Sequence, residues 1–351
     1  MTASLELGPP TNSPGSLFLK PQFRTSVQWP PKDTKLDDKV AIVTGSTSGL
    51  GLESSRQLLS YGLATLILAV RSKEKGERIA SILRNEYTKA TIHVWSLEME
   101  SYDSIQAFAR RVETELTRLD IAILNAGVQA ADFITVHSTG HEKLVQVNYL
   151  STMLLAILLL PILKAKSPNG EPGRLTIVNS GTARGATISE PNDVPILVSL
   201  DDKTRPWKPV ERYAVTKLLA HLFIINLVQQ VDPDDVIVNL VDPGLVKDTA
   251  LQNFAPFIVV AFFYIFKAIF GRSLPVGAST YVDAVVVKGK ESHGCFVSNW
   301  KISPKLTWLT TSFAAFVFTS EGEIAREKLW KETMAEFEFV GARNILDGMK
   351  T

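Results

Sequence analysis

Residues Thr44-Gly-Ser-Thr-Ser-Gly-Leu-Gly51 decide the fold of this chain. They follow a short apolar, β-branched run typical of a buried strand, Val40–Thr44, and precede a helical stretch from Leu52 to about Tyr61. Glycines allow the backbone to turn tightly and to approach a pyrophosphate, whose charge is held by amides at the start of the helix. Their position between strand and helix favours this interpretation over a turn that serves only packing. The residues expected to bind a dinucleotide cofactor here are Gly45, Ser46, Thr47, Ser48, Gly49, Leu50 and Gly51.

Strands and helices alternate along the chain on both sides of this turn. We expect strands at 40–44, 65–70, 91–97, 121–124, 175–179 and 236–241. We expect helices at 52–61, 73–87, 102–119, 141–164 and 213–230. This alternation predicts an α/β fold, a doubly wound parallel sheet of the Rossmann type with helices on both faces. The apolar run Met153–Leu163 is too short to span a bilayer and indicates a buried core or interface helix.

Charge and cysteine content exclude several kinds of partner. Lysine and arginine total 37, and aspartate and glutamate total 36, so the net charge of +1 is too small to attract nucleic acid. The one cysteine, Cys295, cannot form an internal disulfide, and with His293 it lacks the further ligands that a metal site needs. Residues 1–35 are rich in proline and lack the apolar core of a secretory signal, so we interpret them as an irregular N-terminal extension. These features favour a cytoplasmic protein.

The end of the second expected strand carries a cation, Arg71, followed by Ser72 and Lys73. A dinucleotide site that prefers NAD places an acidic residue about 20 residues after the glycine-rich turn, where it binds the ribose 2′-hydroxyl. A cation at this place suits a 2′-phosphate instead, so the sequence favours NADP(H). The alternative is that Arg71 is only a solvated charge at a strand end.

A tyrosine and a lysine stand four residues apart in Tyr213-Ala-Val-Thr-Lys217, on one face of an expected helix. Free tyrosine has a pKa of about 10, too high for easy proton exchange at neutral pH. A nearby cation stabilises the phenolate, so we expect Lys217 to lower the pKa of Tyr213 and make it a general acid or base. The pair alone is common by chance, and the surrounding chain decides its meaning.

With these residues in place, the chain from about Leu36 to Thr249 resembles the short-chain dehydrogenase/reductase family. Its motifs occur in the family's order, and any one of them alone would be weak. Besides the glycine-rich turn and Arg71, the positions that match the family's cofactor contacts are Glu98, Asn125, Ala126, Gly127, Tyr213, Lys217, Pro243, Gly244, Val246 and Thr249. The positions that match its catalytic tetrad are Asn148, Ser180, Tyr213 and Lys217.

The resemblance implies a role for each member of the tetrad. Tyr213 would donate a proton to an alkoxide while hydride moves between nicotinamide and a substrate carbon. Ser180 would hydrogen-bond the carbonyl oxygen and stabilise developing charge. Lys217 would contact the nicotinamide ribose, and Asn148 would organise a water relay. The intact tetrad argues against a dehydratase or epimerase on the same scaffold.

The chain departs from the family pattern in a few places. Glu98 stands where an aspartate usually meets the adenine, and it can still accept hydrogen bonds. The long, proline-rich interval between Ser180 and Tyr213 predicts a flap at about 185–210. Residues 36–351 are expected to form one domain, with a second flap at about 246–275, a terminal strand around 294–297 and a C-terminal helical extension at about 305–351. The whole is similar to the retinol-dehydrogenase-like branch, and its leader and tail resemble fungal members, several of which act in secondary metabolism.

The apolar stretch 254–270 is the least usual part of the chain. It could be a lid on a hydrophobic pocket, a helix that dips into a membrane surface, or a transmembrane helix. The first two interpretations both imply a hydrophobic small-molecule substrate, and the second adds peripheral membrane contact. The resemblance also implies a homodimer through 141–164 and 213–230, although Leu154–Leu160 would suit the core of a monomer equally well.

These observations favour an NADPH-dependent oxidoreductase that reduces a ketone or aldehyde on a hydrophobic molecule, or catalyses the reverse oxidation. The alternative from another class is a non-catalytic NADP-binding regulator or scaffold that has kept the fold. Loss of Ser180, Tyr213 or Lys217 would favour that alternative, and none of them is lost.

Overall fold

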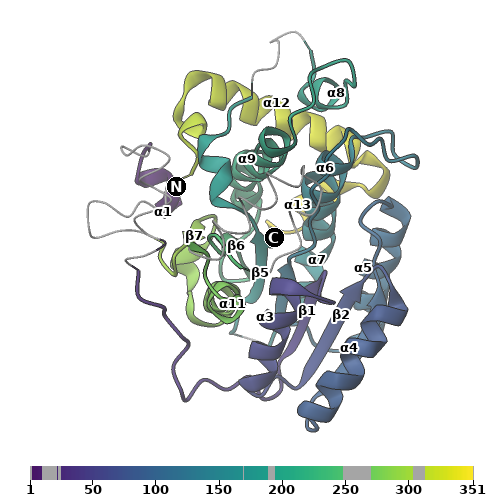
Figure 1. The fold of residues 1–351 in the computed structure, drawn as a ribbon, viewed down its shortest axis with the longest axis vertical. Helices are drawn as coiled ribbons and strands as arrows, with labels where there is room; N and C mark the ends of the chain where they lie inside the picture. The colour runs from purple at the N-terminus through teal and green to yellow at the C-terminus, as the bar shows by residue number, and fades with distance from the viewer. Residues whose placement is uncertain are drawn as a thin grey trace.

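A computed structural model describes residues 2–9, 22, 25–168, 170–188, 194–247, 270–302 and 313–350. Its centre is a seven-stranded parallel sheet in the order β3-β2-β1-β4-β5-β6-β7 (Figure 1). The strands are β1 (Val40–Thr44), β2 (Thr65–Val70), β3 (Thr91–Ser96), β4 (Ile121–Leu124), β5 (Gly173–Val178), β6 (Val236–Asp242) and β7 (Phe296–Ser298). The first strand lies inside the sheet and later strands are added outward on both sides, which confirms the doubly wound Rossmann-type prediction.

Helices cover both faces of the sheet. One face carries α3 (Gly49–Ser60), α4 (Lys73–Glu86) and α11 (Leu274–Val282). The other carries α5 (Tyr102–Glu115), α7 (Thr152–Lys166) and α9 (Pro209–Leu227). Side chains alternate across a strand, so Ile42 packs toward α5, α7 and α9, while Ala41 and Val43 pack toward α3, α4 and α11. Two continuous apolar cores result, one on each face.

The helix expected over 141–164 differs from the prediction in its first turns. It consists of α6 (Lys143–Val145), a π-helical segment η1 (Gln146–Ser151) and then α7. A π-helix is rare and often marks a functional position. The shorter elements are α1 (Ala3–Glu6), η2 (Gly181–Gly185), α8 (Ile196–Leu200), η3 (Val228–Gln230), η5 (Asp283–Val287), η6 (Lys290–Ser292), η7 (Ala315–Phe318) and η8 (Glu338–Val340).

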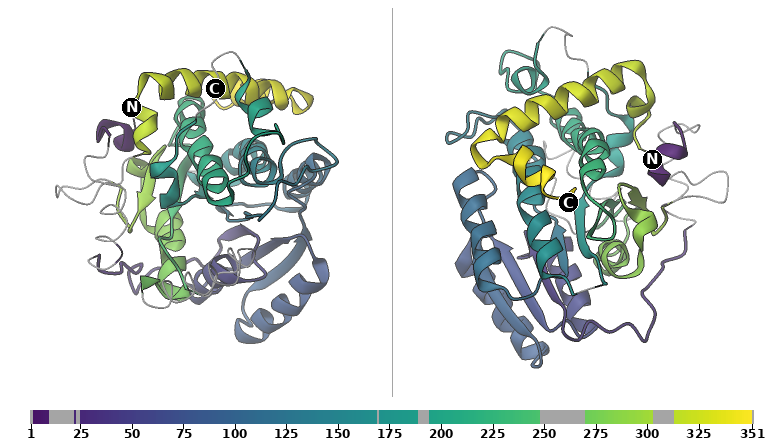
Figure 2. Two further views of the ribbon diagram at one scale, coloured as in Figure 1. Left: turned by 45° about the horizontal axis from the view of Figure 1, so that its top comes forward. Right: turned by 180° about the vertical axis from the view of Figure 1, so that it is seen from behind.

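The C-terminal part of the chain packs against α7 and α9. Helix α12 (Ser320–Glu336) runs along α9, and the short α13 (Ala342–Asp347) lies against α7 (Figure 2). The run Lys143–Lys166 is long and apolar enough to cross a membrane by length and composition, but it is buried inside the fold, as is typical of a core helix. The two helices assigned by resemblance to a dimer interface are therefore covered within the chain, and the homodimer stays a prediction.

The N-terminal leader contacts the last strand of the sheet. Ser4, in α1, is fully buried, and its hydroxyl accepts a hydrogen bond from the amide of Phe296 at 2.9 Å. The leader was expected to be irregular, but its first described residues therefore cover the outer edge of β7. Edge strands are commonly covered in this way.

Helix α12 also holds the described part of the 185–210 flap. The Glu332 carboxylate accepts hydrogen bonds from the amides of Ile196 at 2.8 Å and Leu197 at 2.9 Å, at the start of α8. At the other end of α8, Asp201 Oδ2 lies 2.6 Å from Nδ1 of His141. Residues far apart in sequence thus fix the flap at both ends of α8.

His141 links the flap to α12, and we call its contacts with Asp201 and Glu336 the clasp of His141. Its Nε2 lies 3.1 Å from Oε1 of Glu336 on α12, opposite its contact with Asp201. Burial opposes protonation of the ring, but the hydrogen bonds and charges of Asp201 and Glu336 outweigh it and raise the pKa of His141 to about 9. The imidazolium is therefore present at neutral pH and joins the flap to α12.

Replacing Glu332 with alanine should lower the free energy of unfolding by about 1–2 kcal/mol, because two amides at the start of α8 lose their acceptor. Urea unfolding followed by circular dichroism measures the change. Glu323→Ala on the same helix is the control, because the side chain of Glu323 is 71% exposed. Equal effects of the two substitutions would contradict the role given to Glu332.

Candidate active site at the carboxyl edge of the sheet

The predicted site residues follow the ends of different strands. Gly45 follows β1, Arg71 follows β2, Asn125 follows β4, Ser180 lies just after β5, and Pro243 follows β6. All these strands are parallel, so their carboxyl ends lie at the same edge of the sheet. Ligands of doubly wound sheets bind at this edge.

The side chain of Asn125 forms hydrogen bonds with the glycine-rich turn. Asn125 Nδ2 donates to the carbonyl of Thr44 at 2.9 Å and to that of Gly45 at 3.3 Å. A Cβ atom on Gly51 would lie 2.5 Å from the same Nδ2 and 2.6 Å from the Gly45 carbonyl oxygen, so only glycine fits there. Asn125 therefore holds the glycine-rich turn against the end of β4.

The turn also offers donors that suit an anion. Ser48 precedes α3, but its side chain makes no capping hydrogen bond, so the first amides of the helix have no side-chain acceptor from it. The hydroxyl of Ser46 is fully buried and has no hydrogen-bond partner among the described residues. A buried hydroxyl without a partner beside an uncapped helix start fits a bound phosphate. These residues would hold the pyrophosphate of a dinucleotide.

Arg71 lies at the carboxyl end of β2 with its side chain 69% exposed. Its Nε is 3.9 Å from Glu98 Oε2, and its Nη1 is 3.8 Å from Glu100 Oε1. Exposed pairs at such distances are weak. The guanidinium can therefore reach a ligand phosphate, while Glu98 lies beside it at the same edge. Ser72 is committed elsewhere, because its hydroxyl accepts from the amide of Lys75 and caps α4.

Asn148 lies in the π-helical segment η1. Its Oδ1 accepts from the amide of Val128 at 2.8 Å, and its Nδ2 donates to the Val128 carbonyl at 2.9 Å and to Thr216 Oγ1 at 3.2 Å. A Cβ atom on Gly127 would lie 3.3 Å from Asn148 Oδ1 and 3.9 Å from Nζ of Lys217. The π-helix thus brings Asn148, Gly127 and Lys217 together.

The buried ammonium of Lys217 points toward the end of β5. Its Nζ donates to the carbonyl of Val178 at 2.9 Å and lies 5.7 Å from the centroid of the Tyr213 ring. Burial disfavours the charged form and lowers the pKa of Lys217 to about 8. A positive charge is therefore retained at neutral pH but is lost under mildly alkaline conditions.

Tyr213 and Ser180 are brought together by α9 and the end of β5. Burial and the charge of Asp242 raise the pKa of Tyr213 to about 12, although a hydrogen bond with Ser180 acts in the opposite direction. The expected lowering of this pKa by Lys217 is wrong for this arrangement, because burial disfavours the phenolate. Ser180 Oγ also accepts from Oγ1 of Thr182 at 3.0 Å.

The segment after β6 is held by residues that the sequence did not single out. Arg272 Nη1 donates to the carbonyl of Pro243 at 3.1 Å, and Gln22 Nε2 donates to the carbonyl of Leu245 at 2.8 Å. The side chains of Val246 and Leu50 pack into one of the apolar cores rather than standing free at the edge. Thr249, residues 254–269 and most of the 246–275 flap lie outside the described residues. No local motif marks Gln22 or Arg272.

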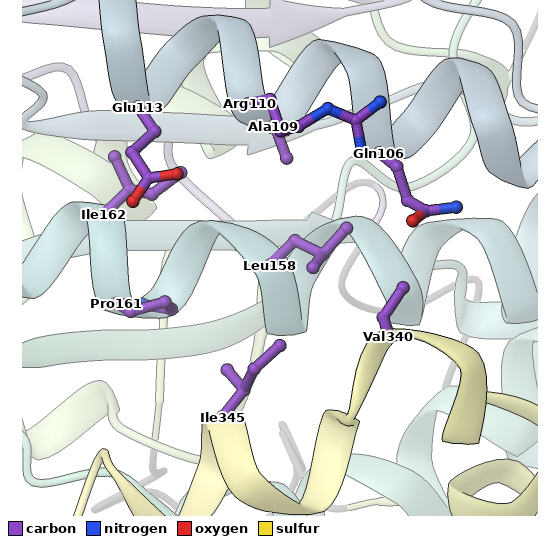
Figure 3. Close-up of a pocket in the computed structure, with 9 residues that line it drawn as sticks. All are labelled: Gln106, Ala109, Arg110, Glu113, Leu158, Pro161, Ile162, Val340 and Ile345. Carbon is purple, nitrogen blue, oxygen red and sulfur yellow. The ribbon is translucent and has the colours of Figure 1, made fainter.

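A cavity of about 320 Å³ lies elsewhere in the fold, between α5, α7 and the C-terminal residues Val340 and Ile345 (Figure 3). Its lining is mainly apolar, with the polar side chains of Gln106, Arg110 and Glu113 coming from α5. None of the predicted site residues lines it. The candidate site therefore rests on the carboxyl edge of the sheet and not on this cavity.

Comparison with known proteins identifies similar sequences over the whole chain. The sequence profile of a family described as short chain dehydrogenase matches residues 39–191. The short chain dehydrogenase/reductase mfmJ of Annulohypoxylon moriforme is 53% identical over 352 residues, which cover 100% of this chain and 99% of the relative. The short chain dehydrogenase virL of Hypocrea virens is 42% identical over 327 residues, which cover 91% of each chain.

A solved structure gives the same fold at lower sequence identity. The NADPH-dependent 3-quinuclidinone reductase of Rhodotorula rubra is 19% identical, with a TM-score of 0.55, over 75% of this chain and 92% of its own. At this identity the likeness concerns the fold alone.

Proposed function

Because this chain belongs to the short-chain dehydrogenase/reductase family and is an oxidoreductase of that family, we propose that it uses NADPH to reduce a ketone or aldehyde on a hydrophobic small molecule. The reverse oxidation uses the same residues. The observation that carries the proposal is the grouping of Ser180, Tyr213 and Lys217 at the carboxyl edge of the sheet, with Asn148 behind them.

The protonation of Tyr213 supports the reductive direction. With a pKa raised to about 12, the phenol keeps its proton at neutral pH and can donate it to the oxygen of the forming alkoxide. Ser180, which already hydrogen-bonds the phenol, donates to the same oxygen and stabilises its developing charge. A bound nicotinamide supplies the hydride. Tyr213 is then reprotonated from the side of Lys217 and Asn148.

Other residues of the edge hold the cofactor. The amides of the 45–51 turn and the buried hydroxyl of Ser46 would bind the pyrophosphate. Arg71 would bind the 2′-phosphate, which is the basis for choosing NADPH over NADH. Glu98 lies 3.9 Å from Arg71 and would accept hydrogen bonds near the adenine.

The substrate class follows from the apolar sequence 254–270. As a lid or a membrane-dipping helix, this stretch would favour an apolar substrate. The fungal origin of the similar proteins supports a place in fungal secondary metabolism. The alternative, a non-catalytic NADP-binding scaffold, predicts cofactor binding without turnover.

Fluorescence titration with NADPH and with NADH should give tighter binding of NADPH. Arg71→Asp should weaken NADPH binding by about 10- to 100-fold, because the 2′-phosphate meets a like charge, and should leave NADH binding nearly unchanged. Arg78→Asp is the control, since Arg78 is similarly exposed (70%) but lies on α4. Equal affinity of the unchanged protein for NADPH and NADH would contradict NADPH specificity.

Tyr213→Phe should lower kcat for reduction of lipophilic ketones and aldehydes by about 10²- to 10⁴-fold, because the proton donor is removed. NADPH affinity should stay close to that of the unchanged protein, as titration can verify. Tyr87→Phe, a change at the C-cap of α4, serves as the control. Cellular function that survives Tyr213→Phe unaltered would favour the non-catalytic alternative.

The rate of reduction should be steady below pH 8 and should fall above it. The pKa of Lys217 is lowered to about 8, so its ammonium is present below that pH and is lost as the pH rises through it. The test is steady-state kcat/KM for the carbonyl substrate, measured at saturating NADPH between about pH 6 and 10. This range extends about two pH units to either side of the pKa of Lys217. Lys217→Arg keeps its charge and should remove the alkaline fall in whatever activity it retains. A profile of the unchanged enzyme that is flat to pH 10 would be incompatible with this role of Lys217.

A further inference from the structure

The turn after β6, residues 243–247, is held by hydrogen bonds from several parts of the chain. Gly244 has a φ of 75°, a left-handed conformation that favours glycine. Its amide donates to Oδ1 of the buried Asp242 at 3.0 Å, and Oδ2 of Asp242 accepts from the hydroxyl of Ser298 at 3.2 Å. The last residue of β6 thus ties the turn to β7.

Arg272 contacts this turn through both its backbone and its side chain. Its amide donates to the carbonyl of Leu245 at 2.8 Å, and its carbonyl accepts from the amide of Lys247 at 2.8 Å. Its Nη1 donates to the carbonyl of Pro243 at 3.1 Å. The side chain is only 8% exposed, and a buried guanidinium is costly unless its donors are used. These contacts hold every second residue of the turn, Pro243, Leu245 and Lys247.

The far side of the same guanidinium supports a strained turn after β7. Nη2 of Arg272 hydrogen-bonds Oδ1 of Asn299, and its Cζ lies 4.8 Å from the centroid of the Trp300 ring. Asn299 and Trp300 have φ values of 55° and 58°, a left-handed conformation that asparagine tolerates but that is costly for tryptophan. Such strain persists only where the surroundings enforce it, and it is frequent at functional sites.

Gln22 reaches the turn from the N-terminal extension. Its Nε2 donates to the carbonyls of Leu245 at 2.8 Å and Phe270 at 2.9 Å, and its Oε1 accepts from the amide of Leu245 at 3.3 Å. Leu245 and Phe270 flank residues 248–269, so one side chain joins the two ends of that segment. The leader therefore takes part in the edge of the site.

We infer that Arg272, assisted by Gln22, is a positioning residue that holds the 243–247 turn in the shape needed for the cofactor contacts that the family resemblance assigns to Pro243, Gly244 and Val246. The inference rests on the proposed function, because it concerns the same cofactor. Neither residue touches the reacting atoms. Arg272 acts through the backbone of Pro243, Leu245 and Lys247, and Gln22 acts through that of Leu245. A preformed turn binds without a cost for ordering it.

The test measures NADPH affinity and backbone protection in the full-length protein. Arg272→Met should raise the Kd for NADPH by about tenfold or more, and Gln22→Ala by about threefold, because the turn must be ordered when the cofactor binds. Hydrogen exchange of the free proteins should show faster exchange of the Leu245 and Lys247 amides in both variants. This second measurement does not depend on any cofactor.

Matched controls separate positioning from general destabilisation. Arg174→Met removes another partly buried arginine, which donates to the carbonyl of Lys288 at the opposite edge of the sheet, and should lower Tm without changing the Kd. Gln28→Ala removes an exposed glutamine of the same leader. Gln22→Ala keeps the test open if Arg272→Met fails to fold.

Two results would overturn the inference in different ways. An unchanged Kd for NADPH in a folded variant with faster exchange at Leu245 would show that the contacts of Arg272 and Gln22 with the turn are structural only. The proposed function would then stand. Binding of neither NADPH nor NADH by the unchanged protein would remove the proposed function and this inference together.

Discussion

All strands of the sheet run in the same direction, and this constraint gathers the functional residues. In a parallel sheet the segments that follow the strands emerge at one edge, so side chains far apart in sequence become neighbours there. Asn125 shows how tightly this edge is built, because its amide fills the space that a side chain at Gly51 would need. The phosphate turn and the loop after β4 are consequently one unit.

Burial governs the protonation of the pair at the centre of the site. It favours the neutral forms of both groups, so the pKa of Tyr213 rises and that of Lys217 falls. A protonated phenol beside a lysine of lowered pKa suits proton donation to an alkoxide. The π-helical segment that carries Asn148 places an amide behind the lysine, and its hydrogen bonds to Val128 fix that amide.

Both extensions of the chain close on the central domain. Helix α12 fixes the flap that precedes Tyr213 through Glu332 and the clasp of His141, and it covers α9. The N-terminal leader covers β7 through Ser4 and reaches the turn after β6 through Gln22. These segments lie outside the central α/β repeat, yet they support the loops at its carboxyl edge.

The sequence by itself determined the order of strands and helices, the fold, and the identity of the family, because these depend on local patterns and on short motifs at fixed spacing. The observed bounds of β1, β2 and β4 equal the predicted ones. The tetrad was predicted from its motifs through the family resemblance. Only the tertiary structure decided the π-helix at Asn148, the raised pKa of Tyr213, and the contacts that Arg272 and Gln22 make with the turn after β6. A pKa depends on burial from every side, and Gln22 meets Leu245 across 223 positions of sequence. No local pattern records a contact of that kind, so it becomes visible only when the chain is folded.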